Sequence, residues 1–270
     1  MSAHLHEYFG APEQQALQQR ADHVWTLLKD DPRFCCHGRA VGLAEASAET
    51  IETQVALAKL QGACSVEGVP KALAGTRHAA LAGAGLKTDQ FDVWCGDGGA
   101  LSAAEEVIRS IAWPSDLEIV SVDGSTSGED MAQLDALTQS CGVLLPMGAF
   151  MRGHRRPAVC LFARDSAGRI VGSTAAVAQF HPGSPKAGTV WWGMLATDEA
   201  RRGQGIAVLL GAHSMLAMRD RFGYEQVFTG IREGNTPSER LCGKLGLSPS
   251  DTVVIIAIAP ELFASGRVTK

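Results

Sequence analysis

One stretch decides the fold of this chain: Arg201-Arg202-Gly203-Gln204-Gly205-Ile206-Ala207. It follows the apolar run Thr189–Ala196 and precedes a helical pattern that begins at Ile206. A glycine-rich turn therefore joins a strand to a helix N-terminus, where unpaired N–H groups and the positive end of the helix dipole meet. Glycines let a bulky anion approach such a backbone. The stretch predicts a phosphate cradle.

Two other glycine motifs do not fit this turn. A P-loop requires Lys and then Ser or Thr after its last glycine, but Gly205 is followed by Ile206 and Ala207. The dinucleotide fingerprint requires a third glycine where this chain has Val208, and no acidic residue ends a strand about 20 positions later. A tight connection without any ligand is the remaining alternative.

The turn resembles the acetyl-CoA motif of the GNAT N-acetyltransferase superfamily, (Gln/Arg)-x-x-Gly-x-(Gly/Ala), over Arg202–Ala207. The preceding segment 195–200 matches as well, except that Glu199 replaces the usual proline. The resemblance implies acetyl-CoA as the donor substrate. Its pyrophosphate is expected at the Arg202 side chain and at the backbone N–H groups of Gly203, Gln204, Gly205, Ile206 and Ala207.

A second motif lies about 30 residues further on, in the segment Asn235–Leu247. Thr236 is expected as the N-cap of a short helix, with Glu239 closing a capping box and Gly246 just past the end. The segment resembles the later GNAT element that begins with Asn and ends near Lys-x-Gly. Both motifs in this order favour the family over a chance match.

The chain divides near residues 113–116. Residues 1–114 read as a mainly helical region, with helices over 12–28, 46–60, 69–84 and 102–111 and one strand over 90–95. We interpret this region as a degenerate GNAT-like half, and a helical extension is the alternative. The loop 96–99 is a turn signal and not a nucleotide site.

Residues 115–270 are expected to be the GNAT N-acetyltransferase domain. Strands are predicted over 117–122, 158–163, 170–178, 189–196, 226–231 and 252–258, with helices over 130–140 and from 206 to Gly223. This order of elements is similar to the GNAT arrangement, and the resemblance implies an α/β (α+β) fold with a mixed, mostly antiparallel sheet flanked by helices.

Composition limits the classes of partner. A net charge of −5 argues against nucleic acid, and no apolar run is long enough to span a membrane. The first seven residues lack the basic and apolar regions of a signal peptide. Seven scattered cysteines in a chain of 270 residues favour reduced thiols in the cytoplasm and no metal site. A homodimer is one assembly that stays open.

The resemblance also implies how the rest of the donor is held. The main chain of Leu195, Ala196 and Thr197 is expected to bind the pantetheine arm and polarise the thioester carbonyl. Asn235 is expected to bridge to the pantetheine or the strand end. Ser238 is a further candidate at this site, and a plain polar residue of the first helical turn is its alternative.

The proton-transfer groups are less well marked. Cys242 stands where family members often place a Tyr that protonates the departing thiolate, so it is a candidate general acid; a small buried hydrophobe is the alternative. The strand 189–196 has no acid, so Glu225 is the candidate base, directly or through water, with Glu233 and the loop residue His181 beside it. For each of these three, a solvated surface group is the commoner explanation.

Two further features concern the acceptor. Trp191 and Trp192 point to opposite faces of their strand, so one should be core while the other lines the acceptor pocket. The basic run 151–157 reads as a solvated face or as a site for an acidic acceptor. We predict an N-acetyltransferase that acts on a small or amino-acid-like primary amine by direct attack in a ternary complex. A catalytically quiet acyl-CoA-binding or regulatory protein is the alternative, and a nucleotide-binding protein is a third class.

Overall fold

A computed structural model of the chain describes residues 5–264, and within that range its strands form one ten-stranded sheet. The predicted absence of a signal peptide rests partly on residues 1–4, which lie outside this range. The helices are α1 (Pro12–Leu28), α2 (Thr50–Gln61), α3 (Lys71–Gly83), α4 (Gly98–Ser110), α5 (Gly128–Ser140), α6 (Gly148–Met151), α7 (Ile206–Phe222) and α8 (Thr236–Lys244).

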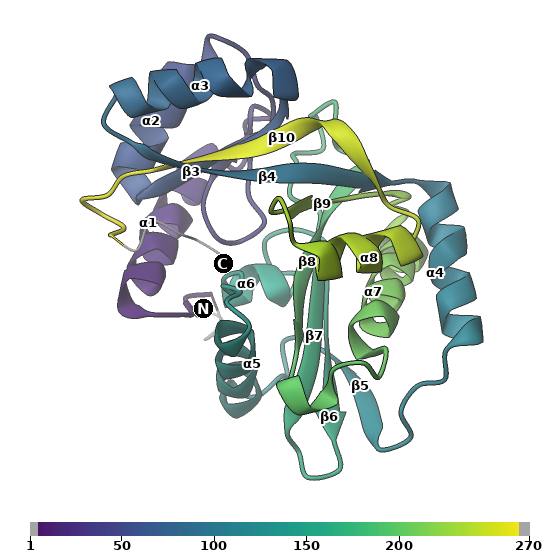
Figure 1. Ribbon diagram of the computed structural model, residues 1–270. Coiled ribbons are helices and arrows are strands. Elements are labelled where there is room, and N and C mark those ends of the chain that lie inside the picture. Colours follow the sequence, from purple (N-terminus) through teal and green to yellow (C-terminus); the bar gives the residue numbers. More distant parts are fainter. Residues whose placement is uncertain (1–4, 265–270) are drawn as a thin grey trace.

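The strands cross the molecule in two directions. They are β1 (Phe34–Cys35), β2 (Gly42–Leu43), β3 (Ala63–Pro70), β4 (Lys87–Gly96), β5 (Leu117–Ser121), β6 (Ala158–Asp165), β7 (Ile170–Val177), β8 (Thr189–Thr197), β9 (Gln226–Ile231) and β10 (Ser248–Ile258). Figure 1 shows β5 to β8 running side by side while β9, β4, β10 and β3 run across them.

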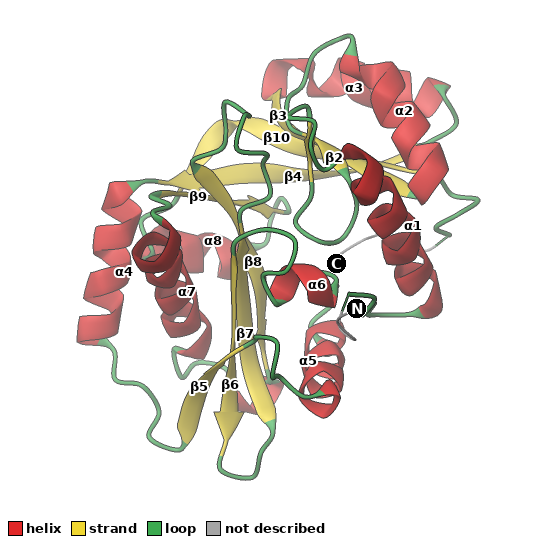
Figure 2. Cartoon of the chain, turned by 180° about the vertical axis from the view of Figure 1, so that it is seen from behind, coloured by secondary structure: helices red, strands yellow, loops and turns green. Residues whose placement is uncertain are grey.

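Helices cover both faces of the β5–β8 portion. α4 and α7 lie on one face, and α5 and α6 lie on the other, as both Figure 1 and Figure 2 show. Trp192 of β8 is fully buried against α7, where its Nε1 donates a hydrogen bond to Ser214 Oγ at 3.0 Å. A side chain at Gly211 would lie 2.6 Å from the Trp192 ring, so this glycine lets α7 pack closely on the sheet.

The two ends of the chain interleave in the sheet. The strand order is β1-β2-β3-β10-β4-β9-β8-β7-β6-β5. β10, near the C-terminus, therefore lies antiparallel between β3 and β4 of the N-terminal region. In turn, β4 lies antiparallel between β10 and β9. Each half of the chain contributes a strand to the other, which ties residues on either side of position 114 into one sheet.

The same order of elements occurs twice. The units β2-α2-β3-α3-β4 and β8-α7-β9-α8-β10 each run strand, helix, strand, helix, strand. The first two strands of each unit are parallel neighbours, and the last strand of each is the one that enters the other unit. β1 and β7, which precede the units, also pair in the same antiparallel sense with β2 and β8.

The predicted fold class is confirmed, with local differences. The helix over 12–28 and the strand over 226–231 have the predicted ends, and the other predicted elements differ by a few residues. Strand β3 was missed because Gly68 and Pro70 break its apolar pattern, and a helix was expected from Val69 onward. α4 begins at Gly98 rather than Ser102, because the Asp97 side chain accepts a hydrogen bond from the Gly99 N–H and caps the helix.

Candidate functional site

The site begins where two parallel strands separate. β8 and β9 pair only at Thr189, Val190 and Trp191, opposite Gln226, Val227 and Phe228. Beyond Trp191 the two strands diverge, while β9 stays paired with β4 along its other edge as far as Ile231. The backbone of β8 on that side therefore has no ladder partner from Trp192 to its end. This opening lies at the turn of direction within the sheet (Figure 1).

A β-bulge shapes the open part of β8. Met194 has a φ of 58°, a left-handed conformation that is costly for a side chain of this size. The register between β7 and β8 shifts at the same place, between Ser173 and Ala175. Ser173 Oγ donates a hydrogen bond to the Met194 carbonyl at 2.9 Å and helps to hold the bulge. Bulges of this kind re-aim the backbone beside a site.

The glycine turn follows β8 as the sequence predicts. Gly203 and Gly205 have φ values of 81° and 77°, which only glycine adopts easily. Gly205 is the N-cap of α7, and no side chain caps the first turn of this 17-residue helix. Its N-terminal N–H groups are therefore available to an anion, and the helix dipole favours a negative charge there.

The two arginines of the motif have different partners. Arg201 forms an ion pair with Asp116 at 2.8 Å and a hydrogen bond with Gln204 Oε1 at 3.0 Å, so it joins the turn to the segment before β5. Arg202 is exposed and lies 3.7 Å from Glu199. Arg202 also lines the adjoining cavity, so it is the arginine placed to meet a ligand.

One cavity of about 470 Å³ runs along the opening between β8 and β9. Five of the predicted site residues line it: Leu195, Arg202, Asn235, Ser238 and Cys242. The remaining cradle and strand residues lie outside its lining: Ala196, Thr197, Gly203, Gln204, Gly205, Ile206 and Ala207. Arg202 lines the cavity, and the glycine turn 203–207 follows it directly in the chain.

Helix α8 begins one residue earlier than the sequence suggests. Its N-cap is Asn235 rather than Thr236, because the Asn235 side chain accepts a hydrogen bond from the Ser238 N–H at 3.3 Å. The predicted capping box of Thr236 and Glu239 is therefore wrong. The helix ends as expected, with Gly246 at a φ of 72° just past it. Asn235 combines a structural role with a place on the cavity wall.

Cys242 of α8 is buried in an apolar cluster that also contains residues of α4 and α7, but it reaches the cavity wall. Burial raises the pKa of its thiol to about 12. Such a thiol keeps its proton at neutral pH and is a poor source of protons for a leaving thiolate. The environment of Cys242 thus favours its reading as a small hydrophobe over that of general acid.

The structure does not bring the predicted bases to the cavity. Glu225 is exposed immediately before β9, at the closed end of the β8–β9 opening, and Glu233 is exposed after β9. His181 lies in a loop where its Nδ1 accepts a hydrogen bond from the Gly183 N–H. None of the three lines the cavity.

The N-terminal region supplies the polar groups that the sequence did not reveal. His37 stacks on Trp191 with ring centres 4.4 Å apart, and Arg39 places its guanidinium 5.0 Å from the same ring. Burial and the Arg39 charge lower the pKa of His37 to about 3, so its ring is neutral. Its Nδ1 bonds to Gln179 Oε1 at 2.9 Å. Trp191 and Trp192 both line the cavity, but the polar groups of the N-terminal region contact the Trp191 ring, whereas the Trp192 ring bonds to Ser214 of α7.

Glu67 of β3 also lines the cavity, and a second bulge places it there. Val66 and Val69 pair with Ile255 and Val253, so β3 has one extra residue at this point, and Gly68 has a φ of 74°. Burial raises the pKa of Glu67 to about 7, although the Lys186 charge and the polar groups of Ser65 and Gln179 act in the opposite direction. The carboxyl group can thus change its charge near neutral pH.

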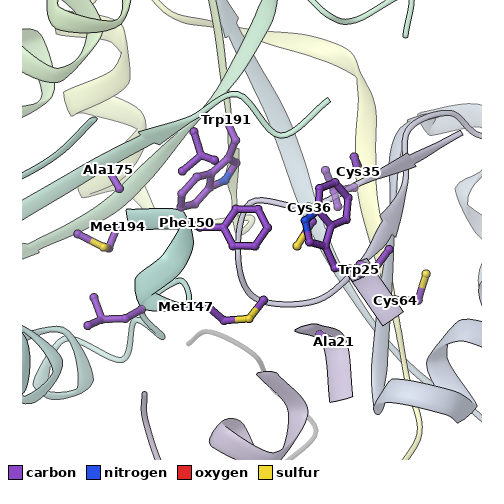
Figure 3. Packing of buried hydrophobic residues seen from close by; sticks show 14 of the residues in the cluster. Ala21, Trp25, Cys35, Cys36, Cys64, Met147, Phe150, Ala175, Trp191 and Met194 are labelled. Carbon is purple, nitrogen blue, oxygen red and sulfur yellow. The ribbon is translucent and has the colours of Figure 1, made fainter. Parts of the chain in front are cut away.

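The basic run before β6 is neither a solvated face nor a ligand site. The Arg152 side chain is fully buried and pairs with Glu7 at 2.7 Å, and Arg155 pairs with the buried Asp22 of α1 at 2.9 Å. Arg156 lies over the Trp25 ring at 5.1 Å. These contacts dock the N-terminal segment onto the second half of the chain. Figure 3 shows Phe150 between Trp191 and Trp25 at this junction.

Comparisons with known proteins agree with this geometry. Residues 130–247 match the model of the Acetyltransferase (GNAT) family. A GCN5-related N-acetyltransferase from Kribbella flavida is 15% identical over 91% of this chain and 95% of that chain, with a TM-score of 0.55. A tandem GNAT protein from the clavulanic acid biosynthesis pathway is 18% identical over 77% of this chain and 67% of that chain, with a TM-score of 0.52. These likenesses show the fold.

A third solved structure, of a Drosophila protein, is 13% identical over 92% of this chain and 89% of that chain, with a TM-score of 0.55. Curated proteins give no match to this sequence. Among the helices of residues 5–264, none combines the length and the apolar character needed to cross a membrane.

Proposed function

We propose that this chain, whose residues 130–247 match the GNAT acetyltransferase family, transfers an acetyl group from acetyl-CoA to the primary amine of a small or amino-acid-like acceptor. One observation carries the proposal. A single cavity extends from Arg202, past the separation of the strands at Trp191, to Glu67 of the other half. Donor and acceptor would meet there in one ternary complex, which is what direct attack requires.

The donor would be held by the second unit of the repeat. Its pyrophosphate would accept hydrogen bonds from the N–H groups of the turn 203–207, next to the Arg202 charge. The uncapped start of α7 and the two left-handed glycines support this assignment. The pantetheine arm would lie along the unpaired edge of β8 at residues 195–197, with Asn235 and Ser238 across the opening.

The Met194 bulge supports a role in polarising the thioester. A backbone N–H aimed at the carbonyl oxygen stabilises the negative charge that develops during attack, and a fixed donor costs no reorganisation. The left-handed φ of Met194 and the Ser173 hydrogen bond fix the backbone at this place. We assign this hydrogen-bond donor to the backbone N–H at Leu195, as the resemblance implies.

Glu67 is the base that the geometry favours. It lines the cavity, whereas Glu225 does not. The reaction needs one proton removed from the ammonium group before attack, and a carboxyl group with a pKa of about 7 accepts it near neutral pH. The free amine then bonds to the carbonyl carbon, the C–S bond breaks, and the second proton lost by the nitrogen ends on the leaving sulfur.

The topology of residues 1–114 supports their assignment as a degenerate GNAT-like half. The first unit repeats the strand and helix order of the second. Its loop between β2 and α2 reads Ala44-Glu45-Ala46-Ser47-Ala48-Glu49, with no glycine and two acidic residues. Such a loop would repel a pyrophosphate, so only the second unit is assigned a donor site. The first unit contributes cavity wall instead.

The catalytically quiet acyl-CoA-binding protein is the competing reading, favoured by the absence of a tyrosine at position 242. Thiol release from acetyl-CoA separates the two when a broad panel of primary amines is added to the purified chain. We expect amine-dependent release with at least one class of amine. Tight CoA binding without release across the panel would support the quiet reading. Stabilisation by ATP or NAD but not by CoA would exclude both.

We assign the reaction to the cytoplasm because the cysteines of this chain are free thiols. In residues 5–264 the seven cysteines are free, and five of them are buried: Cys35, Cys36, Cys64, Cys160 and Cys242. Reduced cysteines of this kind suit a reducing compartment. A homodimer stays a prediction.

A further inference from the structure

We infer that the acceptor carries a carboxylate and that Arg39 binds it, so that the substrates are small amino carboxylates. This inference rests on the proposed function and names the substrate class of the same cavity. It begins with a buried cation that has no counter-ion. Arg39 is 8% exposed, and burial alone lowers the pKa of its guanidinium, to about 10. Within residues 5–264 no carboxylate forms an ion pair with it.

The hydrogen bonds of Arg39 are also incomplete. Its Nε donates to the Leu144 carbonyl at 2.7 Å, which fixes the side chain. Its Nη2 is buried and has no hydrogen-bond partner in the described part of the chain. An unpaired buried guanidinium is costly, and such a group calls for a ligand to complete it. The free end of a guanidinium offers two parallel N–H groups, which match the two oxygens of a carboxylate.

The surroundings exclude a partner from the cavity wall itself. Glu67 is the one acidic residue that lines the cavity in the described chain, and Lys186 rather than Arg39 acts on its pKa. Arg232, also on the wall, already forms an ion pair with Asp89 at 2.5 Å. His37 is neutral and stacks on Trp191. Arg202 lines the other end of the cavity, is exposed and lies 3.7 Å from Glu199. Among the described residues of the wall, Arg39 is therefore the buried arginine without an ion pair.

Position distinguishes an acceptor carboxylate from the phosphates of CoA. Arg39 lies over Trp191, where β8 and β9 separate, while the phosphate cradle follows Thr197 at the far end of β8. Six residues of extended strand span about 20 Å. The acyl end of acetyl-CoA would reach Trp191, where β8 and β9 separate, and its phosphates would stay at the cradle. An anion bound by Arg39 would therefore belong to the molecule that attacks the thioester. That molecule is the acceptor.

Glu67 then completes the recognition of an amino carboxylate. Arg39 lies in the loop before β2 and Glu67 lies in β3, and both residues line the cavity. The Arg39 guanidinium would bind the carboxylate of the acceptor, while the ionised carboxylate of Glu67 receives a proton from its ammonium group. Both come from the half of the chain that lacks a cradle, so the first unit would serve as the acceptor-binding half of a single active site.

The test compares matched acceptors with acetyl-CoA as donor. The probes are α-, β- and γ-amino acids, each beside its primary amide, and acetylation is followed by thiol release and by the mass of the product. We expect kcat/KM for the preferred amino acid to exceed that for its amide about 100-fold or more, as for loss of a buried charge pair. Equal rates for the acid and its amide would overturn the inference, and this comparison needs no variant.

Variants then assign the preference to Arg39. Arg39→Met should lower kcat/KM for the amino acid about 100-fold, change that for the amide less than about threefold, and leave the Kd for CoA unchanged. Arg39→Lys should recover part of the loss, because it keeps the charge but not the paired N–H groups. Arg33→Met, at an exposed arginine paired with Asp31, is the matched control and should change nothing. A weaker Kd for CoA in Arg39→Met would place the anion on the donor and overturn the inference.

Thermal stability tests the acceptor site even if the protein does not acetylate amines. If CoA binds but no amine is acetylated, the shift in Tm on adding the same amino acids and amides to the CoA complex still tests the acceptor site. Stabilisation by amino acids alone, lost in Arg39→Met, would support the carboxylate site in a protein without turnover. No difference between acids and amides, in turnover or in Tm, would refute it.

Discussion

The Arg39 guanidinium carbon lies 5.0 Å from the centre of the Trp191 ring, and Trp191 is the last residue of β8 that pairs with β9. A residue of the N-terminal region thus lies at the point where the two strands of the second half separate. The interleaved sheet makes this contact possible, because β10 and β4 each enter the other half. The two halves of the chain contribute to one cavity.

The glycine turn can be tested with two glycines of the same conformation at opposite ends of α7. Gly203 and Gly223 have φ values of 81° and 76°, and a Cβ at either would meet no atom within 4 Å. Alanine should therefore cost about 1 kcal/mol of folding stability at each position. Only Gly203→Ala should weaken CoA binding, about tenfold, or ~1.4 kcal/mol. Calorimetry of CoA binding checks this, and equal affinities in the two variants would argue against the cradle.

The base assignment predicts a pH profile. Because burial raises the pKa of Glu67 to about 7, its carboxylate forms as the pH rises through about 7. For wild type, kcat/KM should rise over this range and then level off. Glu67→Gln should lower kcat/KM about 100-fold or more and remove this limb. The variant, measured with the same acceptor, controls for ionisation of the amine itself. A Glu67→Gln profile of wild-type shape would assign the limb to another group.

The same pKa predicts a change in stability with a defined sign. Glu67 has a folded-state pKa of about 7 against 4.5 for an ordinary Glu, so the unfolded chain loses its proton first as the pH rises. Wild type therefore loses stability between about pH 4.5 and about pH 7, by at most ~3 kcal/mol from this group. The Glu67→Gln side chain cannot ionise. The free energy of unfolding of this variant, relative to wild type, should therefore rise between about pH 4.5 and about pH 7 and stay constant at higher pH. Urea denaturation at several pH values measures the difference, and a constant difference would show that Glu67 is not buried in this way.

Cys242 offers a test of the proton donor. A thiol with a pKa near 12 releases its proton poorly, so Cys242→Ala should lower kcat less than about threefold. The loss of a buried side chain should instead lower stability by about 1–2 kcal/mol. A true general acid would cost about 100-fold or more in kcat. Steady-state kinetics beside urea denaturation separates the two roles, and a loss of that size with unchanged stability would restore Cys242 as the acid.

The glycine turn and the helices that follow it were predictable from the sequence because their determinants are local. A strand, two glycines and a helix start stand next to one another along the chain, and so do the residues of α8. The helix–strand order of the second half followed from periodicity, and its fold class is confirmed. Even here the cap of α8 was misplaced by one residue, because Asn235 and Thr236 are both good N-cap residues.

The cavity wall contributed by the N-terminal region was not predictable, because its residues are far apart in sequence and lack a pattern. His37 and Arg39 stand in a loop between two-residue strands, and Glu67 stands in a strand interrupted by a bulge. Nothing local indicates that β10 inserts between β3 and β4 and brings these residues to Trp191. The basic run near Arg152 shows the converse: its charges are conspicuous in the sequence but serve to dock the N-terminal segment.

The central claim is that one cavity joins acyl donor and amine acceptor for direct transfer. Its most direct test is a single turnover with acetyl-CoA carrying ¹³C in the acetyl group, followed by mass spectrometry of acceptor and protein. We predict one labelled acetyl group on the acceptor nitrogen for each free CoA thiol formed, and none on the protein. Label on Cys242, or bound acetyl-CoA that stays intact in the presence of the amino acid panel, would contradict the account.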